Sequence, residues 1–405
     1  MLLLAACLLV FAPGFNAGIT NWDDDLYVRA PESQRISAGT FTHFVFGSFH
    51  PLTIFSFAIE EQLFGRNAFV LHATNILLHA ASAILLFVLL QDLGAQTFGA
   101  FAGALLWAIH PLRVESVVWI AERKDVLCTL FFIAALIAYV RRRLMLAFVL
   151  FVLALLSKGM AVTFPLAMLC VDYLQRRRAL AEKIPFFATS AVFAIVGVVG
   201  QRPGGAINSP ALVCQTVLFY LGKVFLPIHL NAVYLYPQRI FWFSIPIVMA
   251  IVIAAFANRV FAFAILFFLA TISIVLPFVG WSDTVAADRF MYIPSIGIAY
   301  AIAVMAKPKA WPAVALIAAI LAALTFQRSR VWHDSFSLWD SVIAADPRLP
   351  QAYNGRAAAL FSRGDLTGAR RDIDRALAID PCYAPALRNR AALGGPRDTL
   401  AKCQK

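Results

Sequence analysis

The chain has 405 residues, of which 61% are hydrophobic and only 14% are charged. So few charges cannot keep the surface of a water-soluble protein of this size hydrated, so most of the outer surface is expected to face lipid. The net charge of +12 does not indicate nucleic-acid binding, because many basic residues stand in short runs beside apolar segments. Six cysteines without a C-x-x-C pair argue against a zinc site or a disulfide framework.

A series of apolar segments predicts a polytopic membrane protein with an all-α fold. The first apolar run, at 2–18, lacks the basic start and the cleavage site of a signal peptide, so we interpret it as a first spanning helix. Further apolar runs lie at 70–91, 98–118, 126–140, 144–157, 160–175, 185–200, 242–258, 260–280, 291–306 and 310–326. Together they predict about eleven spans, several of them short enough to require tilting.

The basic residues predict the orientation of these spans. They recur at the same phase along the chain, at Arg141–Arg143, Arg176–Arg178, Arg259, Lys307 and Lys309. If these residues mark the cytoplasm, the amino terminus lies inside and the carboxyl terminus outside. The stretch 211–228 is interrupted by Lys223 and Pro227, and we interpret it as a re-entrant or surface segment on the outer side.

The composition changes after Phe326, which predicts a membrane domain at 1–326 and a polar helical domain at 327–405. Within the second domain, 350–381 places aromatic, small, turn and closing residues where a 34-residue tetratricopeptide unit has them, for example Tyr353, Ala357 and Gly364. The sequence therefore predicts a short tetratricopeptide domain on the outer side. Its apolar face is expected to need support from the membrane domain or a partner.

The longest outer loop, about 19–69, begins with NWDDDLYV. Its three adjacent carboxylates, Asp23, Asp24 and Asp25, repel one another and are costly beside a bilayer unless they are used. They indicate either a general base or a cation anchor at the membrane face. The alternative is a solvated cluster at a helix end that only fixes the topology.

A second polar motif, HPLRVESVVWIAERKDVL, spans 110–127. On a continuous helix, Glu115, Trp119, Glu122 and Arg123 would share one face. Arg123 and Lys124 are donors suited to a phosphate group. The alternative is an internally salt-bridged loop without a ligand.

Isolated polar residues at the outer boundary complete the candidate set. Lys158 and Arg289 oppose the positive-inside bias, so we expect each to neutralise a lipid head group or a neighbouring carboxylate, unless it only reaches for the interface. His50 adds a possible polar partner. His72 and His79 lie two helical turns apart, but without a third ligand in register a hydrogen-bonded role within the helix is favoured over a metal pair.

Together these features favour an enzyme that takes a group from a lipid phosphate on the outer face of the membrane. A carboxylate would accept the proton of the nucleophile, and Arg and Lys would stabilise the leaving phosphate.

The ordered motifs resemble a known family. NWDDDLYV, HPLT at 50–53, HATNILLH at 72–79, the 110–127 motif, LLSKGMAVTFPL at 155–166 and ADRFMYIPSIG at 287–297, followed by the repeats, are similar to the transmembrane-and-TPR protein O-mannosyltransferases and their bacterial relatives. The resemblance implies a GT-C membrane domain that uses a polyprenyl-phosphate-linked sugar.

The same resemblance implies roles for individual residues. The catalytic carboxylate matches Asp23 or Asp24, and the second motif contributes Glu115, Arg123, Lys124 and Asp125 to substrate binding. Lys158 and Arg289 are candidates for the lipid phosphate, with His50 beside them. Gly159 departs from the family, because bacterial relatives often have Pro there, and the repeat array is shorter than in animal members.

These considerations predict a membrane glycosyltransferase that moves a sugar from a polyprenyl phosphate to an acceptor hydroxyl, such as a Ser or Thr of an exported protein. The expected location is a bacterial inner membrane, with the repeats in the periplasm. Expected partners are membrane lipid, the lipid-linked donor and a protein acceptor held by the repeats, with no nucleic acid. The alternative function is a non-catalytic scaffold for a periplasmic or surface partner. The sugar, the acceptor and any divalent metal are left open.

Overall fold

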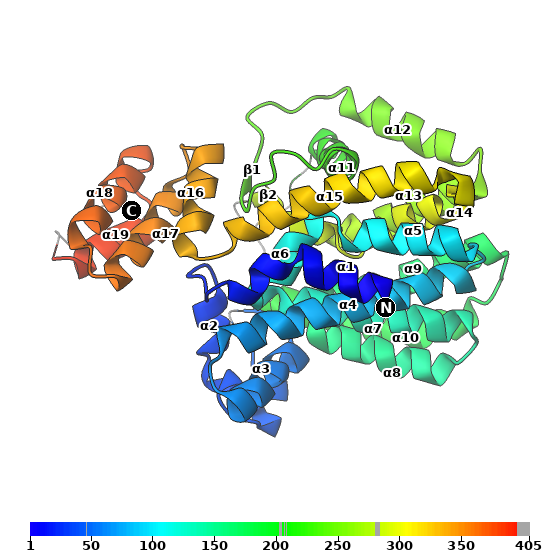
Figure 1. Cartoon of the computed structure of the whole chain (residues 1–405), viewed down its shortest axis with the longest axis horizontal. Coiled ribbons are helices and arrows are strands. Elements are labelled where there is room, and N and C mark those ends of the chain that lie inside the picture. Colours follow the sequence, from blue (N-terminus) through cyan, green and yellow to red (C-terminus); the bar gives the residue numbers. More distant parts are fainter. Residues whose placement is uncertain (46, 202–204, 206, 208, 280–283, 395–405) are drawn as a thin grey trace.

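The computed structural model describes residues 1–45, 47–201, 205, 207, 209–279 and 284–394, and helices dominate this part of the chain (Figure 1). The α-helices up to the first long polar motif are α1 (Leu2–Val10), α2 (Asp24–Val28), α3 (Pro51–Phe64), α4 (Ala68–Asp92), α5 (Thr97–Ala108), α6 (Val114–Val118) and α7 (Arg123–Val140). The next group is α8 (Leu144–Ser157), α9 (Phe164–Gln175), α10 (Ile184–Gln201), α11 (Pro210–Phe225), α12 (Ser244–Ala255), α13 (Arg259–Ile272), α14 (Ser295–Met305) and α15 (Trp311–Val331). The carboxyl-terminal helices are α16 (Ser335–Ala345), α17 (Pro350–Ser362), α18 (Leu366–Ile379) and α19 (Ala384–Ala392).

Short 3₁₀ helices and one small sheet connect these elements. The 3₁₀ helices are η1 (Ala12–Asn16), η2 (Pro31–Ser33), η3 (Ala38–Phe41), η4 (Pro111–Arg113), η5 (Ile120–Glu122), η6 (Gly159–Thr163), η7 (Ala181–Lys183), η8 (Ser273–Val275), η9 (Asp288–Met291) and η10 (Pro308–Ala310). Strands β1 (Tyr234–Leu235) and β2 (Thr284–Ala286) pair antiparallel. The predicted all-α fold class is confirmed.

The predicted number of about eleven spans is not confirmed. Within the described residues, three segments are long and apolar enough to cross a membrane, namely Ala68–Asp92, Ala181–Gln201 and Pro308–Val331. The pair Thr97–Ala108 and Pro111–Val118 makes a fourth if it is one span bent by 57°. The other apolar helices have 10–17 residues, which is short for an upright span.

Two predicted segments differ in extent from the sequence-based expectation. The first apolar run is a helix only over Leu2–Val10, and the chain continues as η1, in which a Pro occupies the first turn. The stretch 211–228 forms the 16-residue helix α11, which ends at Phe225, before Pro227. Pro227 cannot donate the backbone hydrogen bond that continuation of the helix would need.

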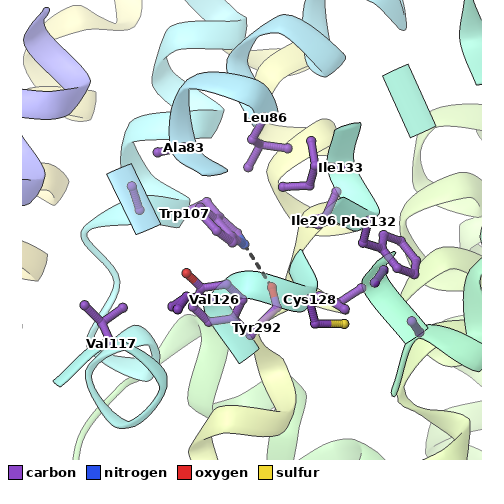
Figure 2. Close-up of a cluster of buried hydrophobic side chains, with 14 of the residues drawn as sticks. Ala83, Leu86, Trp107, Val117, Val126, Cys128, Phe132, Ile133, Tyr292 and Ile296 are labelled. Atoms are coloured by element: carbon purple, nitrogen blue, oxygen red, sulfur yellow. Dashed lines mark hydrogen bonds between the residues drawn. The ribbon is translucent and has the colours of Figure 1, made fainter. Parts of the chain in front are cut away.

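The bundle core is built from α4, α5, α7 and the start of α14 (Figure 2). The indole Nε1 of Trp107 donates to the backbone oxygen of Tyr292 at 3.2 Å. This bond satisfies a polar group that would otherwise be costly to bury. Figure 2 shows apolar side chains around this pair, among them Ala83, Leu86, Phe132, Ile133 and Ile296.

The first outer loop contains an element that the sequence analysis did not predict. Helix α3 starts directly after His50 and buries Ile54 and Phe57. The hydroxyl of Thr53 donates to the backbone oxygen of Ser157 at 3.0 Å. This bond holds the start of α3 beside the end of α8, and so brings His50 close to Lys158.

The carboxyl-terminal helices α16–α19 gather at one end of the molecule (Figure 1). Helix α15 continues to Val331, past the predicted boundary at 326. Helices α17 and α18 occupy the predicted repeat at 350–381, and their buried side chains form a cluster of their own with α19. Leu338 and Trp339 of α16 instead join the core of the membrane part.

Candidate active site

The three adjacent carboxylates of the first outer loop point to three different places. Asp24 is fully buried and accepts hydrogen bonds from the backbone nitrogen and hydroxyl of Thr20, at 2.9 and 2.7 Å, and from the backbone nitrogen of Ala121, at 2.7 Å. Asp25 pairs with Arg29 at 3.1 Å on the surface. Asp23 lines a cavity. Only Asp23 therefore presents its carboxylate to a space that a ligand can enter.

This cavity, which we call the charged cavity, has a volume of about 450 Å³. Its walls come from the first outer loop up to His50, the second polar motif, helix α10 and the chain around η6 and η9. Its ionisable lining residues are Asp23, His50, Glu122, Lys124, Lys158 and Arg289.

Glu122 holds the three cations of the charged cavity together. Its carboxylate lies 2.8 Å from Nζ of Lys158, 3.1 Å from Nζ of Lys124 and 3.4 Å from Nε of Arg289. Burial alone would raise the pKa of Glu122, but the three cations outweigh it and hold the pKa well below its usual range. One carboxylate thus fixes three cations around a shared point.

Two further carboxylates pair with Lys158 and Arg289. Asp125 pairs with Lys158 at 2.7 Å and accepts from the hydroxyl of Ser116 at 3.0 Å. Glu115 pairs with the guanidinium of Arg289 and also accepts from its backbone nitrogen at 3.0 Å. The expectation that Lys158 and Arg289 neutralise neighbouring carboxylates is confirmed.

Burial has a different effect on the carboxyl group of Asp23, which does not bridge three cations as Glu122 does. It raises the pKa of Asp23 above its ordinary value, although Lys124 acts in the opposite direction. A carboxylate with a raised pKa holds a proton more firmly, which suits a group that accepts one.

Two buried nitrogens of the charged cavity have no hydrogen-bond partner in the described part of the chain: Nε2 of His50 and Nε1 of Trp119. Burial lowers the pKa of His50 to about 3, so its imidazole is neutral. A buried polar atom without a partner is costly unless a ligand or water completes it. A bound oxygen-rich group would provide the missing acceptor for Trp119.

A second, apolar cavity of about 320 Å³ adjoins the charged cavity. The two share lining residues, including Lys158, Gly159, Phe193 and Phe290. Its remaining lining comes mainly from apolar side chains of α10 and of the chain on either side of η8, among them Val198, Val275 and Pro277. Of the three cations, Lys158 lines both cavities and thus stands where the polar space meets the apolar one.

The predicted shared face of the second polar motif is wrong, because no continuous helix forms there. Helix α6 ends at Val118, Trp119 is extended with φ −72° and ψ 117°, and α7 starts only after η5. Side chains from elsewhere bind the backbone at this break. Asp24 accepts from Ala121, and the amide of Asn75 donates to the oxygens of Trp119 and Ile120 at 3.4 Å.

The break sends consecutive residues in opposite directions. Lys124 lines the charged cavity, whereas Arg123 is fully buried elsewhere. The guanidinium of Arg123 pairs with Glu60 at 2.5 Å and donates to Asn75 at 2.8 Å and to the oxygen of Leu71 at 2.9 Å. The structure therefore does not bring Arg123 to the cavity.

Among the described residues no cluster of three or more His, Cys, Asp or Glu could hold a metal ion. Both histidines of α4 make hydrogen bonds to other elements and not within the helix. His79 contacts the hydroxyl of Tyr292 at 2.5 Å and the backbone oxygen of Ala108 at 2.9 Å, and His72 contacts the oxygen of Gly18 at 3.3 Å.

No protein-family model matches the chain. Over 378 residues the chain is 26% identical to protein O-mannosyl-transferase F38B6.6 of Caenorhabditis elegans. The alignment covers 83% of this chain and 54% of the worm protein. A segment of 95 residues is 38% identical to mouse protein O-mannosyl-transferase TMTC1, and covers 23% of this chain and 10% of that protein. The predicted resemblance to the protein O-mannosyl-transferases is confirmed.

The chain spans about half the length of this worm protein. It also aligns with a crystal structure of ArnT from Cupriavidus metallidurans bound to undecaprenyl phosphate. That alignment has a TM-score of 0.48 and 15% identity, and it covers 97% of this chain and 77% of ArnT.

The sequence patterns did not predict the roles of two residues at the charged cavity. They included Glu122 within the second motif but gave it no role, and they assigned none to Tyr27, whose ring lies 4.6 Å from Nζ of Lys124. The available signal was the charge run around Glu122, in which one acid stands beside two bases. Two of the three cations, Lys158 and Arg289, and the ring of Tyr27 come from other parts of the chain.

Proposed function

We propose that the chain is a membrane glycosyltransferase that moves a sugar from a polyprenyl phosphate to an acceptor hydroxyl. The observation that carries the proposal is the charged cavity, where Asp23 faces Lys124, Lys158 and Arg289 next to an apolar cavity. A lipid phosphate needs cations for its head and an apolar space for its chain, and the two cavities offer these side by side.

In the proposed reaction Asp23 is the general base. It accepts the proton of the acceptor hydroxyl while the hydroxyl oxygen attacks the anomeric carbon of the sugar. The bond between that carbon and the phosphate oxygen breaks, and the lipid phosphate leaves with the bonding electrons. Lys124, Lys158 and Arg289 stabilise the negative charge that develops on the phosphate.

The remaining predicted residues support this arrangement. Glu122 keeps the three cations in place, while Glu115 and Asp125 hold Arg289 and Lys158 from behind. We assign Nε1 of Trp119 and Nε2 of His50 to the oxygens of the donor, because neither nitrogen has a partner in the described residues. Asp24 anchors the loop to Ala121 and takes no part in proton transfer.

The names of the relatives guide the choice of substrates. Because they are protein O-mannosyl-transferases, we propose mannose as the sugar and a Ser or Thr of an exported protein as the acceptor. We further propose that residues 327–405 form a tetratricopeptide domain on the outer, periplasmic face of a bacterial inner membrane. There it would bind the acceptor.

The acidic triplet provides its own control for the test. The purified chain in proteoliposomes is given undecaprenyl-phosphate mannose and a peptide rich in serine and threonine, and mannosyl peptide and released undecaprenyl phosphate are measured. We expect Asp23→Asn to lower kcat by about 10²- to 10⁴-fold, the usual contribution of a general base. Asp25→Asn, at the neighbouring exposed residue, is expected to stay close to the wild type.

Equal activity of the wild type and Asp23→Asn would contradict the role of Asp23. A wild type that binds an exported protein through residues 327–405 but transfers no sugar would favour the alternative of a non-catalytic scaffold.

A further inference from the structure

Asn21, two residues before Asp23, is held by the carboxyl-terminal helices. Its side-chain nitrogen donates to the backbone oxygen of Gly355 at 2.8 Å, and its side-chain oxygen accepts from Nε1 of Trp339 at 2.7 Å. Its backbone nitrogen donates to the hydroxyl of Ser335 at 2.9 Å. These bonds join residues more than 300 positions apart in the sequence.

The next residue, Trp22, continues the contact toward the charged cavity. Its ring stacks on Trp339 with a centroid distance of 4.9 Å and an interplanar angle of 6°. On another side it meets Trp119 edge-on at 5.7 Å. Because Trp119 lines the charged cavity, one indole bridges helix α16 and the cavity wall.

A glycine in α17 makes room for this arrangement. A Cβ atom at Gly355 would lie 2.2 Å from the ring of Trp339, closer than any real contact. Trp339 itself is only 6% exposed, so its ring has little space to move aside. A side chain at this position would therefore displace Trp339 from Asn21 and Trp22.

The loop that carries Asp23 has one further anchor, on its other side. Asp24 accepts from the backbone nitrogen of Ala121, which ties the start of α2 to the second polar motif. Asp23 thus lies between two attachments, Asn21 with Trp22 on one side and Asp24 on the other. Loss of either attachment would leave Asp23 free to shift relative to the cations.

We infer that helices α16 and α17 position the active site. Through Asn21 and Trp22 they hold Asp23 at the charged cavity. The catalytic consequence rests on the proposed function. A displacement of about 1 Å at a reacting group can cost about 10²-fold in rate. Helices α16 and α17 would then contribute to the reaction itself, in addition to any binding of an acceptor.

The first test measures the position of the loop without any reaction. Amide hydrogen exchange is compared for the full-length wild type, Asn21→Ala, Trp339→Phe and Gly355→Ala in proteoliposomes. We expect the amide exchange rate in the segment 24–28 to rise by about 5- to 10-fold in the three variants. A factor of this size corresponds to the loss of one or two hydrogen bonds. The rest of the bundle is expected to exchange as in the wild type.

The matched control breaks a hydrogen bond of the same kind within the carboxyl-terminal helices. The side-chain nitrogen of Asn389 donates to the side-chain oxygen of Asn354 at 2.8 Å, and neither side chain is a partner of Asn21 or Trp22 in the contacts described above. Asn389→Ala is expected to leave exchange at 24–28 unchanged.

The second test separates positioning from general damage. With undecaprenyl-phosphate mannose as the donor, we expect Asn21→Ala to lower kcat by about 10- to 100-fold. KM for the donor should stay within about twofold, because the cations are untouched. The double variant with Trp339→Phe should be no worse than the more impaired single variant, since both residues act through one contact.

The inference is overturned if exchange at 24–28 is unchanged in both Asn21→Ala and Gly355→Ala. It is also overturned if exchange rises equally throughout the bundle, because that would indicate a purely structural role. A wild type without transferase activity would refute the proposed function, and hydrogen exchange alone would then decide whether the carboxyl-terminal helices hold the loop.

Discussion

At the scale of single residues, neighbours decide what chemically identical side chains can do. Asp24 is saturated by Thr20 and Ala121, Asp25 pairs with Arg29 on the surface, and Asp23 faces Lys124 across the charged cavity. The three differ in burial and in the groups that surround them. Of the three, only Asp23 lines the charged cavity, which is why the proposed function makes it the general base.

The raised pKa of Asp23 predicts the pH dependence of sugar transfer. The base must be deprotonated, so kcat should rise with pH through the pKa of Asp23 and level off above it. Because burial raises this pKa, the midpoint should lie above 3.8, the ordinary value for Asp. Lys124→Met removes a cation that lowers this pKa, so the midpoint should move further upward.

The measurement is kcat as a function of pH in proteoliposomes. Arg29→Met serves as the control, because Arg29 pairs with Asp25 and lines neither cavity. A midpoint that moves downward in Lys124→Met would contradict the assignment of Asp23 as the titrating base.

At the scale of elements, the interruptions of helices shape the site more than the helices do. The break between α6 and α7 lets Glu122 and Lys124 face the charged cavity while Arg123 turns to Glu60. Periodicity could not predict the break, because the groups that bind the backbone there, on Asp24 and Asn75, come from distant parts of the chain. The predicted apolar runs 126–140 and 144–157 lie within α7 and α8, since their pattern is local, whereas the run 98–118 is divided between α5 and α6.

Close packing of α5 and α14 provides a prediction at this scale. A Cβ atom at Gly99 would lie 1.9 Å from the backbone oxygen of Ala303, so the two helices would have to separate in Gly99→Ala. We expect a loss of stability of about 1–3 kcal/mol, the usual cost of overpacking. It should appear as a lower Tm in detergent.

The control for this prediction is Gly222→Ala in α11, where a Cβ atom would meet no atom within 4 Å. Its Tm should be unchanged or higher, because Ala favours a helix over Gly. An equal drop in both variants would point to a general effect of losing glycine.

At the scale of the whole molecule, the charged cavity and a basic turn lie at opposite ends of helix α7. Helix α7 has 18 residues: it begins beside the charged cavity, which Lys124 lines, and it ends at Val140, before the basic turn at 141–143. At 1.5 Å per residue this is about 27 Å, close to the thickness of the hydrocarbon core. The charged cavity and the basic turn therefore suit opposite faces of a membrane.

This separation predicts opposite accessibility of the two ends. In a chain whose native cysteines are replaced, Arg363→Cys in the carboxyl-terminal segment should react with a membrane-impermeant maleimide in intact cells. Arg142→Cys should react only after the membrane is opened. Both side chains are largely exposed, at 64% and 48%, so burial does not hinder the reaction. Labelling of Arg142→Cys in intact cells would reverse the proposed orientation.

The sequence by itself determined the lipid-facing class, the all-α fold and most of the charged residues that line the charged cavity, because apolar content, helical periodicity and short motifs are local properties of the chain. Only the tertiary structure decided which of the three carboxylates faces the cavity, that Glu122 gathers its cations, and that Arg123 does not reach it. It also joined Asn21 to Trp339, more than 300 residues away. The physical reason is that hydrogen bonds and ion pairs between distant segments depend on how the helices pack, which the pattern of one segment does not contain.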